Sequence, residues 1–421
     1  MPFTRAELTE QEPIDARQPR HRLNRTLSLW LLTFYGLGTI VGAGIYIVVG
    51  EVAKQAGMGT PLAFFAAGLI AACTGFAYAE LSARFPDAAG AAAYVSEGLR
   101  SPLIARATGL LVLATGIVIA ASLARGAAGY LAEFVAIPIP LLSSLFVVLF
   151  TGIACLNVRE SVGLAAFLTI VELLGLAFVI AAGSPALSAF PERMTEMIPH
   201  QLVGWVHVST GAFLAFFAYI GFEGLANMAE EAKNPERDLP RAILLSIAIS
   251  SVLYVAVALV VVLAVPMASL IESNAPLALV MSSSRWAAPE LLVAIALIAI
   301  PNGLLADLLM TARLLYGMGK RGLAPEWLAI VSAKQRIPIV ATLTAGGATL
   351  IFAVLIPFTQ LVTATSAMTL IVFLLVNLAL WRLHRTKRHP GAIRAPRWMP
   401  PLAILFCLGL LLSEVSSWIM S

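Results

Sequence analysis

The sequence predicts an all-α polytopic membrane protein with about eleven transmembrane helices. Hydrophobic residues make up 60% of the 421-residue chain and charged residues only 12%, whereas soluble domains contain roughly 45–50% and about 25%. The charged residues gather in short clusters between long apolar runs. Because these runs are uninterrupted rather than alternating, they favour helices over a β-barrel. The composition excludes a water-soluble globular protein.

Eleven segments are apolar over the about 20 residues that a helix needs to cross about 30 Å of hydrocarbon. They cover residues 28–50, 60–82, 106–135, 140–157, 160–183, 205–229, 240–266, 289–318, 338–357, 359–383 and 398–418. We expect the first ten to form two five-helix halves of inverted topology.

The positions of Lys and Arg predict the orientation, because cytoplasmic loops of membrane proteins are enriched in both. When the eleven segments alternate between the two sides, all but four of the 27 Lys and Arg residues fall on the side of the amino terminus. The exceptions are Lys54, Arg125, Arg193 and Arg285. We therefore expect an integral protein of a bacterial inner or plasma membrane, with a cytoplasmic amino terminus and an extracytoplasmic carboxyl terminus.

The predicted organisation follows from these segments. No polar stretch is long enough for a soluble domain, and residues 1–27 lack the apolar core of a signal peptide. The expected parts are a cytoplasmic tail (1–27), a first repeat (28–183), an extracellular connecting loop (184–204), a second repeat (205–383), and a cytoplasmic loop with the eleventh helix (384–421).

Glycines interrupt the first helix near the middle of the membrane. Gly36, Gly38, Gly42 and Gly44 lie within nine residues, and each costs a helix interior about 1 kcal/mol relative to alanine. The run favours unwinding around 42–44. Close helix packing through small residues is the alternative interpretation.

The sixth helix has a similar interruption at a similar depth. Here Glu223 stands between Gly221 and Gly224. An ionisable residue inside the membrane is a functional candidate. We therefore expect this helix to unwind over 220–224.

Two helices broken at one depth expose backbone groups that lipid cannot satisfy. The start of a half-helix attracts anions and its end attracts cations. The pair of breaks therefore suits a zwitterion. We expect free carbonyls near Ile40 and Val41 in the first break and near Phe217, Ala218 and Ile220 in the second. The predicted contacts are a carboxylate on the amides of Gly42, Ala43, Gly44 and Ile45, and an ammonium on the carbonyls of Ile40, Phe217 and Ala218.

These segments resemble the amino acid-polyamine-organocation family of permeases. The matching motifs are VGAGIY (41–46), YAEL (78–81), FAYIGFE (217–223) and AEEAKNPERDLPR (229–241), in the family's order. The resemblance implies a LeuT-like five-plus-five inverted-repeat fold and transport of an amino acid by alternating access. It also implies that Phe217 is the aromatic gate over the substrate.

One departure from the family concerns the coupling of transport. Many proton-coupled or exchanging members place a lysine on helix five facing the first break, and the matching residue here is Glu172. A carboxylate must bind a cation or take up a proton, and burial disfavours its charged form. Glu172 is thus a candidate for proton coupling or ammonium recognition, or a carboxyl merely hydrogen-bonded to helix backbone. Glu223 either ties the unwound segment together or senses protons.

The expected function is secondary active transport of an amino acid, with protons as the coupling ion. The first alternative is an exchanger of amino acids or polyamines. A channel or a non-transporting sensor of the same fold ranks below it. The apolar segments carry no Ser/His arrangement and no His-containing metal motif. We therefore expect no enzyme, no cofactor, no metal site and no nucleic-acid partner.

Overall fold

The computed structural model describes residues 27–42, 44–85, 90–156, 162–229, 231–284, 288–320, 322–332, 337–385 and 393–420. Within these ranges the chain is built of helices joined by turns and loops, with one isolated β-bridge between Leu27 and Ala232. The predicted all-α class is confirmed.

The main helices coincide with the apolar segments of the sequence. Their bounds are α1 Leu29–Val41, α2 Gly44–Ala56, α3 Thr60–Arg84, α5 Pro102–Ala132, α6 Ile139–Ala154, α7 Val162–Gly183, α9 Leu202–Ala215, α10 Pro235–Ala264, α13 Pro289–Lys320, α14 Ile339–Leu355, α15 Phe358–Leu383 and α16 Met399–Met420. Eight stretches of the described chain are long and apolar enough to cross a membrane, and α1, α6 and α14 are shorter apolar helices. The polytopic membrane protein is thus confirmed, while the count of eleven crossings stays a prediction.

Short helices connect the long ones, and the sequence did not predict them. They are η1 Gly57–Gly59, α4 Gly90–Leu99, η2 Ser184–Ala189, α8 Phe190–Met197, α11 Met267–Glu272, α12 Pro276–Ser282 and η5 Glu326–Ala329. The expected loop 184–204 is thus largely helical. Pro185 and Pro191 each stand in the first turn of a short helix, where a missing N–H costs nothing. Elements this short leave no 20-residue apolar signal.

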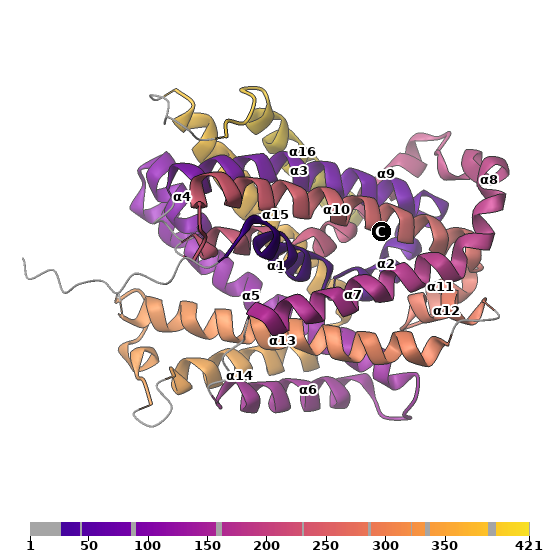
Figure 1. Ribbon diagram of the computed structural model, residues 1–421, viewed down its shortest axis with the longest axis horizontal. Coiled ribbons are helices and arrows are strands. Elements are labelled where there is room, and N and C mark those ends of the chain that lie inside the picture. Colours follow the sequence, from indigo (N-terminus) through magenta and orange to yellow (C-terminus); the bar gives the residue numbers. More distant parts are fainter. Residues whose placement is uncertain are drawn as a thin grey trace, which may run out of the picture.

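The long helices pack as a bundle of roughly aligned rods (Figure 1). Helices α3 and α10 run along one another, as do α5 and α13, and α6 and α14. Helix α1 lies between α7 and α10 in the middle of the bundle, and α16 packs on α15, α9 and α3. Helix α1 thus has α7 and α10 packed against it, and α9 has α2, α3 and α16.

An aromatic cluster fixes the segment that follows the second break. The ring of Tyr78 lies edge-on to those of Tyr94, Phe222 and Phe373, with centroids 5.9, 5.6 and 5.5 Å away. Such edge-to-face contacts add about 0.5–1.5 kcal/mol beyond the buried area. The cluster joins α3, α4 and α15 to the segment Phe222–Met228, which belongs to the sixth predicted membrane segment.

Candidate functional site

The first helix is interrupted where the glycines predict. Helix α1 ends at Val41, Gly42 leaves the helical conformation (φ −21°, ψ −97°), and α2 starts at Gly44. Ala43, predicted to bind substrate, lies outside the described residues. The amide of Gly42 is not free, because it donates to the carbonyl of Gly38 at 3.2 Å. The free donors are those that begin α2, since the first N–H groups of a helix have no partner within it.

The sixth predicted membrane segment, which begins with α9, is interrupted at Ile220 and Gly221. Helix α9 tightens into the 3₁₀ turn η3 (Phe216–Tyr219), Ile220 is extended, and a second 3₁₀ segment, η4 (Phe222–Met228), follows. Gly221 has φ 128°, a conformation open mainly to glycine. The predicted interruption is present, but the carbonyl of Phe217 is not free, because it accepts from the Ile220 amide at 3.3 Å.

The structure brings the two breaks into direct contact. A Cβ on Gly44 would lie 2.7 Å from Ala218 Cα, and one on Gly221 would overlap the carbonyl oxygen of Thr39. Neither backbone could approach so closely with a side chain in between. The glycines thus serve both readings of the sequence, since they interrupt the helices and also permit close packing.

A tyrosine hydroxyl joins the two breaks. Tyr254 of α10 is fully buried, and its Oη lies 2.7 Å from the carbonyl oxygen of Ile40 and 3.0 Å from that of Ala218. These are two of the carbonyls predicted to bind an ammonium. The sequence reasoning missed Tyr254, because a tyrosine in an apolar helix carries no pattern that distinguishes it from a core residue.

Replacing Tyr254 by phenylalanine should destabilise the protein and impair its function together. The two buried carbonyls would lose the single O–H donor that they share, which costs about 1–3 kcal/mol, and the breaks would lose their link. Thermal unfolding and amino acid uptake into vesicles measure both effects. Tyr130→Phe is the matched control, since its buried hydroxyl donates to the carbonyl of Tyr46 at 2.8 Å, and it should lower stability while uptake remains. Equal uptake by both variants would contradict the role of Tyr254.

Glu172 lies beside the break in helix one. Its side chain comes from α7 and is 3% exposed, and a Cβ on Gly42 would be 3.9 Å from Oε2. This oxygen has no hydrogen-bond partner within the part of the chain that the structure describes. The neighbouring Tyr46 donates to the backbone carbonyl of Glu172 rather than to its carboxyl group. A buried carboxyl oxygen with no donor among the described residues therefore lies at the break.

Glu223 has a local partner. Its Oε2 accepts the amide of Gly221 at 2.9 Å. The side chain thus holds the turn in which Gly221 takes its unusual conformation. This contact fits the predicted tying of the unwound segment, and proton sensing by Glu223 stays an untested alternative.

The remaining predicted residues surround the breaks with apolar side chains. Val41 and Ile45 flank the first break and are fully buried, and Phe217 is 4% exposed in η3. Ile220 packs on the same core from the second break. These four residues therefore add apolar surroundings to the polar groups at the breaks, among them the side chains of Glu172, Glu223 and Tyr254.

The fold and the paired breaks define a polytopic integral membrane protein with unwound backbone at its centre. The sequence profile described as "Amino acid permease" matches residues 27–421. The chain belongs to this family, which confirms the predicted resemblance.

Several relatives share the sequence over most of this chain. It is similar to the mitochondrial cationic amino acid transporter 3 of Arabidopsis thaliana, 33% identical over 85% of this chain and 62% of the relative. It is similar to the branched-chain amino acid permease BcaP of Bacillus subtilis (strain 168), 28% identical over 96% and 91%. The human cationic amino acid transporter 4 is 30% identical over 94% and 65%. The chain spans about three fifths of the length of the plant transporters it matches, 62% and 57% in two of them.

Proposed function

We propose that the protein is a secondary active transporter that moves an amino acid across the membrane by alternating access, coupled to proton symport. The observation that carries the proposal is the contact of two interrupted helices inside the bundle, at Gly44 with Ala218 and at Gly221 with Thr39. Unwound backbone at membrane depth is tolerated where protein or a polar solute satisfies it. Paired broken helices are the arrangement in which transporters of inverted-repeat folds bind substrates and ions.

The two breaks would bind the two ends of an amino acid. The amides that begin α2, at Gly44 and Ile45, would hold the carboxylate. The carbonyls of Ile40 and Ala218 would hold the ammonium, since a carbonyl that accepts from Tyr254 has a second lone pair. Because the breaks pack against one another, the substrate would separate them on binding, and Phe217 would close over it.

The side-chain end of the site favours an apolar substrate. Val41, Ile45, Phe217 and Ile220 contribute apolar side chains around the breaks. A branched or otherwise apolar amino acid would pack against these side chains with the least cost, because a charged side chain needs a partner when buried. This preference agrees with BcaP, which is described as a branched-chain amino acid permease, rather than with the relatives described as cationic amino acid transporters.

Glu172 would carry the proton. Its Oε2 is buried, lacks a donor among the described residues, and faces Gly42. Protonation at one side of the membrane and release at the other would change how this oxygen interacts with the break. Exchange of one amino acid or polyamine for another, with Glu172 recognising an ammonium, is the second candidate, because the same oxygen suits that group.

Two halves of inverted topology, 28–183 and 205–383, would perform the alternation. The packing supports this division, since helices at equivalent places in the two halves pair: α3 with α10, α5 with α13, and α6 with α14. The distribution of Lys and Arg supports a cytoplasmic amino terminus and an extracytoplasmic carboxyl terminus.

Uptake into proteoliposomes tests the proposal and separates its two modes. The purified protein is first screened by thermal shift against the twenty amino acids and common amines, because a ligand of the folded state raises its apparent stability. Symport predicts that the stabilising amino acid enters empty vesicles when the interior is more alkaline than the medium. Uptake only into preloaded vesicles would establish exchange. Unsaturable flux would indicate a channel, and binding without any uptake a sensor; either result would overturn the proposal.

A further inference from the structure

A basic pocket lies at the connection between α15 and α16. Its residues are distant in sequence from both breaks. Two adjoining hollows of about 670 and about 330 Å³ share Arg397. Residues 394–397 line the first hollow, and Trp381, His384 and Arg385 line the second with Arg397. Binding pockets for small ligands commonly fall within this range of volumes.

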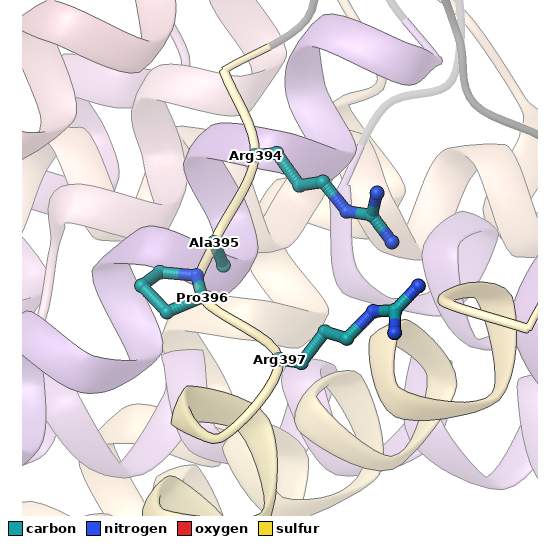
Figure 2. Close-up of a pocket in the computed structure, with 4 residues that line it drawn as sticks. All are labelled: Arg394, Ala395, Pro396 and Arg397. Carbon is teal, nitrogen blue, oxygen red and sulfur yellow. The ribbon is translucent and has the colours of Figure 1, made fainter.

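Two guanidinium groups face the larger hollow. Figure 2 shows the side chains of Arg394 and Arg397 extending from the loop in the same direction. Neither forms an ion pair with a carboxylate that the structure describes, and Nε of Arg394 is buried without a hydrogen-bond partner. Two positive charges directed into one space repel each other, and a bound anion offsets this repulsion. The planar guanidinium group matches phosphate with two parallel hydrogen bonds.

The loop that carries these arginines is anchored to the core. The Ala395 amide donates to Oε2 of Glu80 at 2.8 Å, and the Glu80 side chain is 1% exposed. The same carboxylate pairs with Arg84 and contacts Nε2 of His384 at 2.9 Å. The backbone between the two arginines is therefore held in place, and Glu80 is already occupied by other groups. The pocket is thus positioned in advance, and no described carboxylate serves as its counter-ion.

The pocket lies at the depth of lipid headgroups. Trp381 at the end of α15 and Trp398 just before α16 are 44% and 59% exposed. Exposed tryptophans at the ends of apolar helices mark the interface between hydrocarbon and water. Arg385, Arg394 and Arg397 are thus placed where phosphate groups of the bilayer lie.

We propose that this pocket binds the phosphate of an anionic phospholipid headgroup, held by Arg394 and Arg397. Basic pockets between transmembrane helices bind anionic headgroups elsewhere, and the exposed tryptophans favour a ligand anchored in the bilayer. A soluble phosphate compound has the same anionic chemistry, so the experiment must separate the two sources. The proposal is independent of the transport proposal, because it involves neither break.

Native mass spectrometry of the purified full-length protein in detergent tests this site. Phosphatidylglycerol and phosphatidylcholine are added in parallel, and the bound fraction is measured. The wild-type protein should retain phosphatidylglycerol preferentially. Arg397→Gln should weaken its retention about tenfold, the effect of losing one charge-assisted hydrogen bond, and the double variant Arg394→Gln/Arg397→Gln should weaken it further. Arg397 is exposed, so the single variant should fold even if the double one does not.

The control removes the same charge elsewhere at the same end of the bundle. Arg237 and Arg241 are exposed on the first turns of α10, which runs antiparallel to α3, so they lie at the end where Glu80 lies. Arg237→Gln/Arg241→Gln should leave retention unchanged. Equal retention by wild type and Arg397→Gln would overturn the site. Stabilisation by inorganic phosphate at constant ionic strength that requires Arg397, without phosphatidylglycerol binding, would overturn the lipid as its source.

Discussion

Replacing Gly221 by alanine should abolish amino acid uptake and lower the stability of the protein. At φ 128° an alanine is strained, at a cost on the order of 1–3 kcal/mol. Its Cβ would in addition overlap the carbonyl oxygen of Thr39, and backbone cannot move aside as a flexible side chain can. The two breaks would be held apart and could not return to the contact that they make before the substrate separates them. Uptake into proteoliposomes and thermal unfolding of the purified variant measure the two effects.

The matched control lies three residues further along the same segment. A Cβ on Gly224 would have no atom within 4 Å, and its φ is not in the positive range. Gly224→Ala should therefore retain both stability and uptake. Normal uptake by Gly221→Ala would show that the close approach of the two breaks is not needed for transport.

Replacing Glu172 by glutamine should remove the drive that a pH gradient gives to uptake. Glutamine keeps the shape of the side chain but can neither release nor bind a proton in the physiological range. The rate of uptake into vesicles with an alkaline interior should fall at least about tenfold, which corresponds to an activation free energy about 1.4 kcal/mol higher. Exchange into preloaded vesicles should persist. Initial rates with and without the gradient provide the measurement.

The control for Glu172 is a carboxylate away from the breaks. Glu133, just beyond the end of α5, is exposed and accepts the Asn274 amide at 3.3 Å. Glu133→Gln should keep the response to the gradient. If Glu172→Gln keeps it as well but has a raised KM, the carboxylate recognises the ammonium instead. If neither the gradient response nor KM changes, Glu172 has no role in transport.

Patterns close in sequence were predicted well. The apolar runs marked the main helices because a membrane helix must show its character over about 20 consecutive residues. The glycines around Gly42 and Gly221 marked both interruptions, since a missing side chain weakens a helix wherever it occurs. The position of Glu172 beside the first break followed from a resemblance, and its role stays a prediction.

Individual hydrogen bonds were predicted poorly. The amide of Gly42 and the carbonyl of Phe217 were expected to be free, but each has a backbone partner within four residues. The Gly42 amide makes an ordinary α-helical bond to the residue four before it, and the Phe217 carbonyl belongs to a tightened turn, a common way for a helix end to satisfy its groups. It depends on dihedral angles that the residue types alone do not set.

The sequence by itself determined that the chain is a helical membrane protein and where its two central helices break, because composition and local backbone preference decide these properties. Its motifs determined which family it resembles. Only the tertiary structure decided that Tyr254 joins the breaks and that Arg394 and Arg397 share an anchored pocket. Those contacts join residues that are distant along the chain, such as Ile40 and Tyr254, and the packing of whole helices sets which distant groups meet.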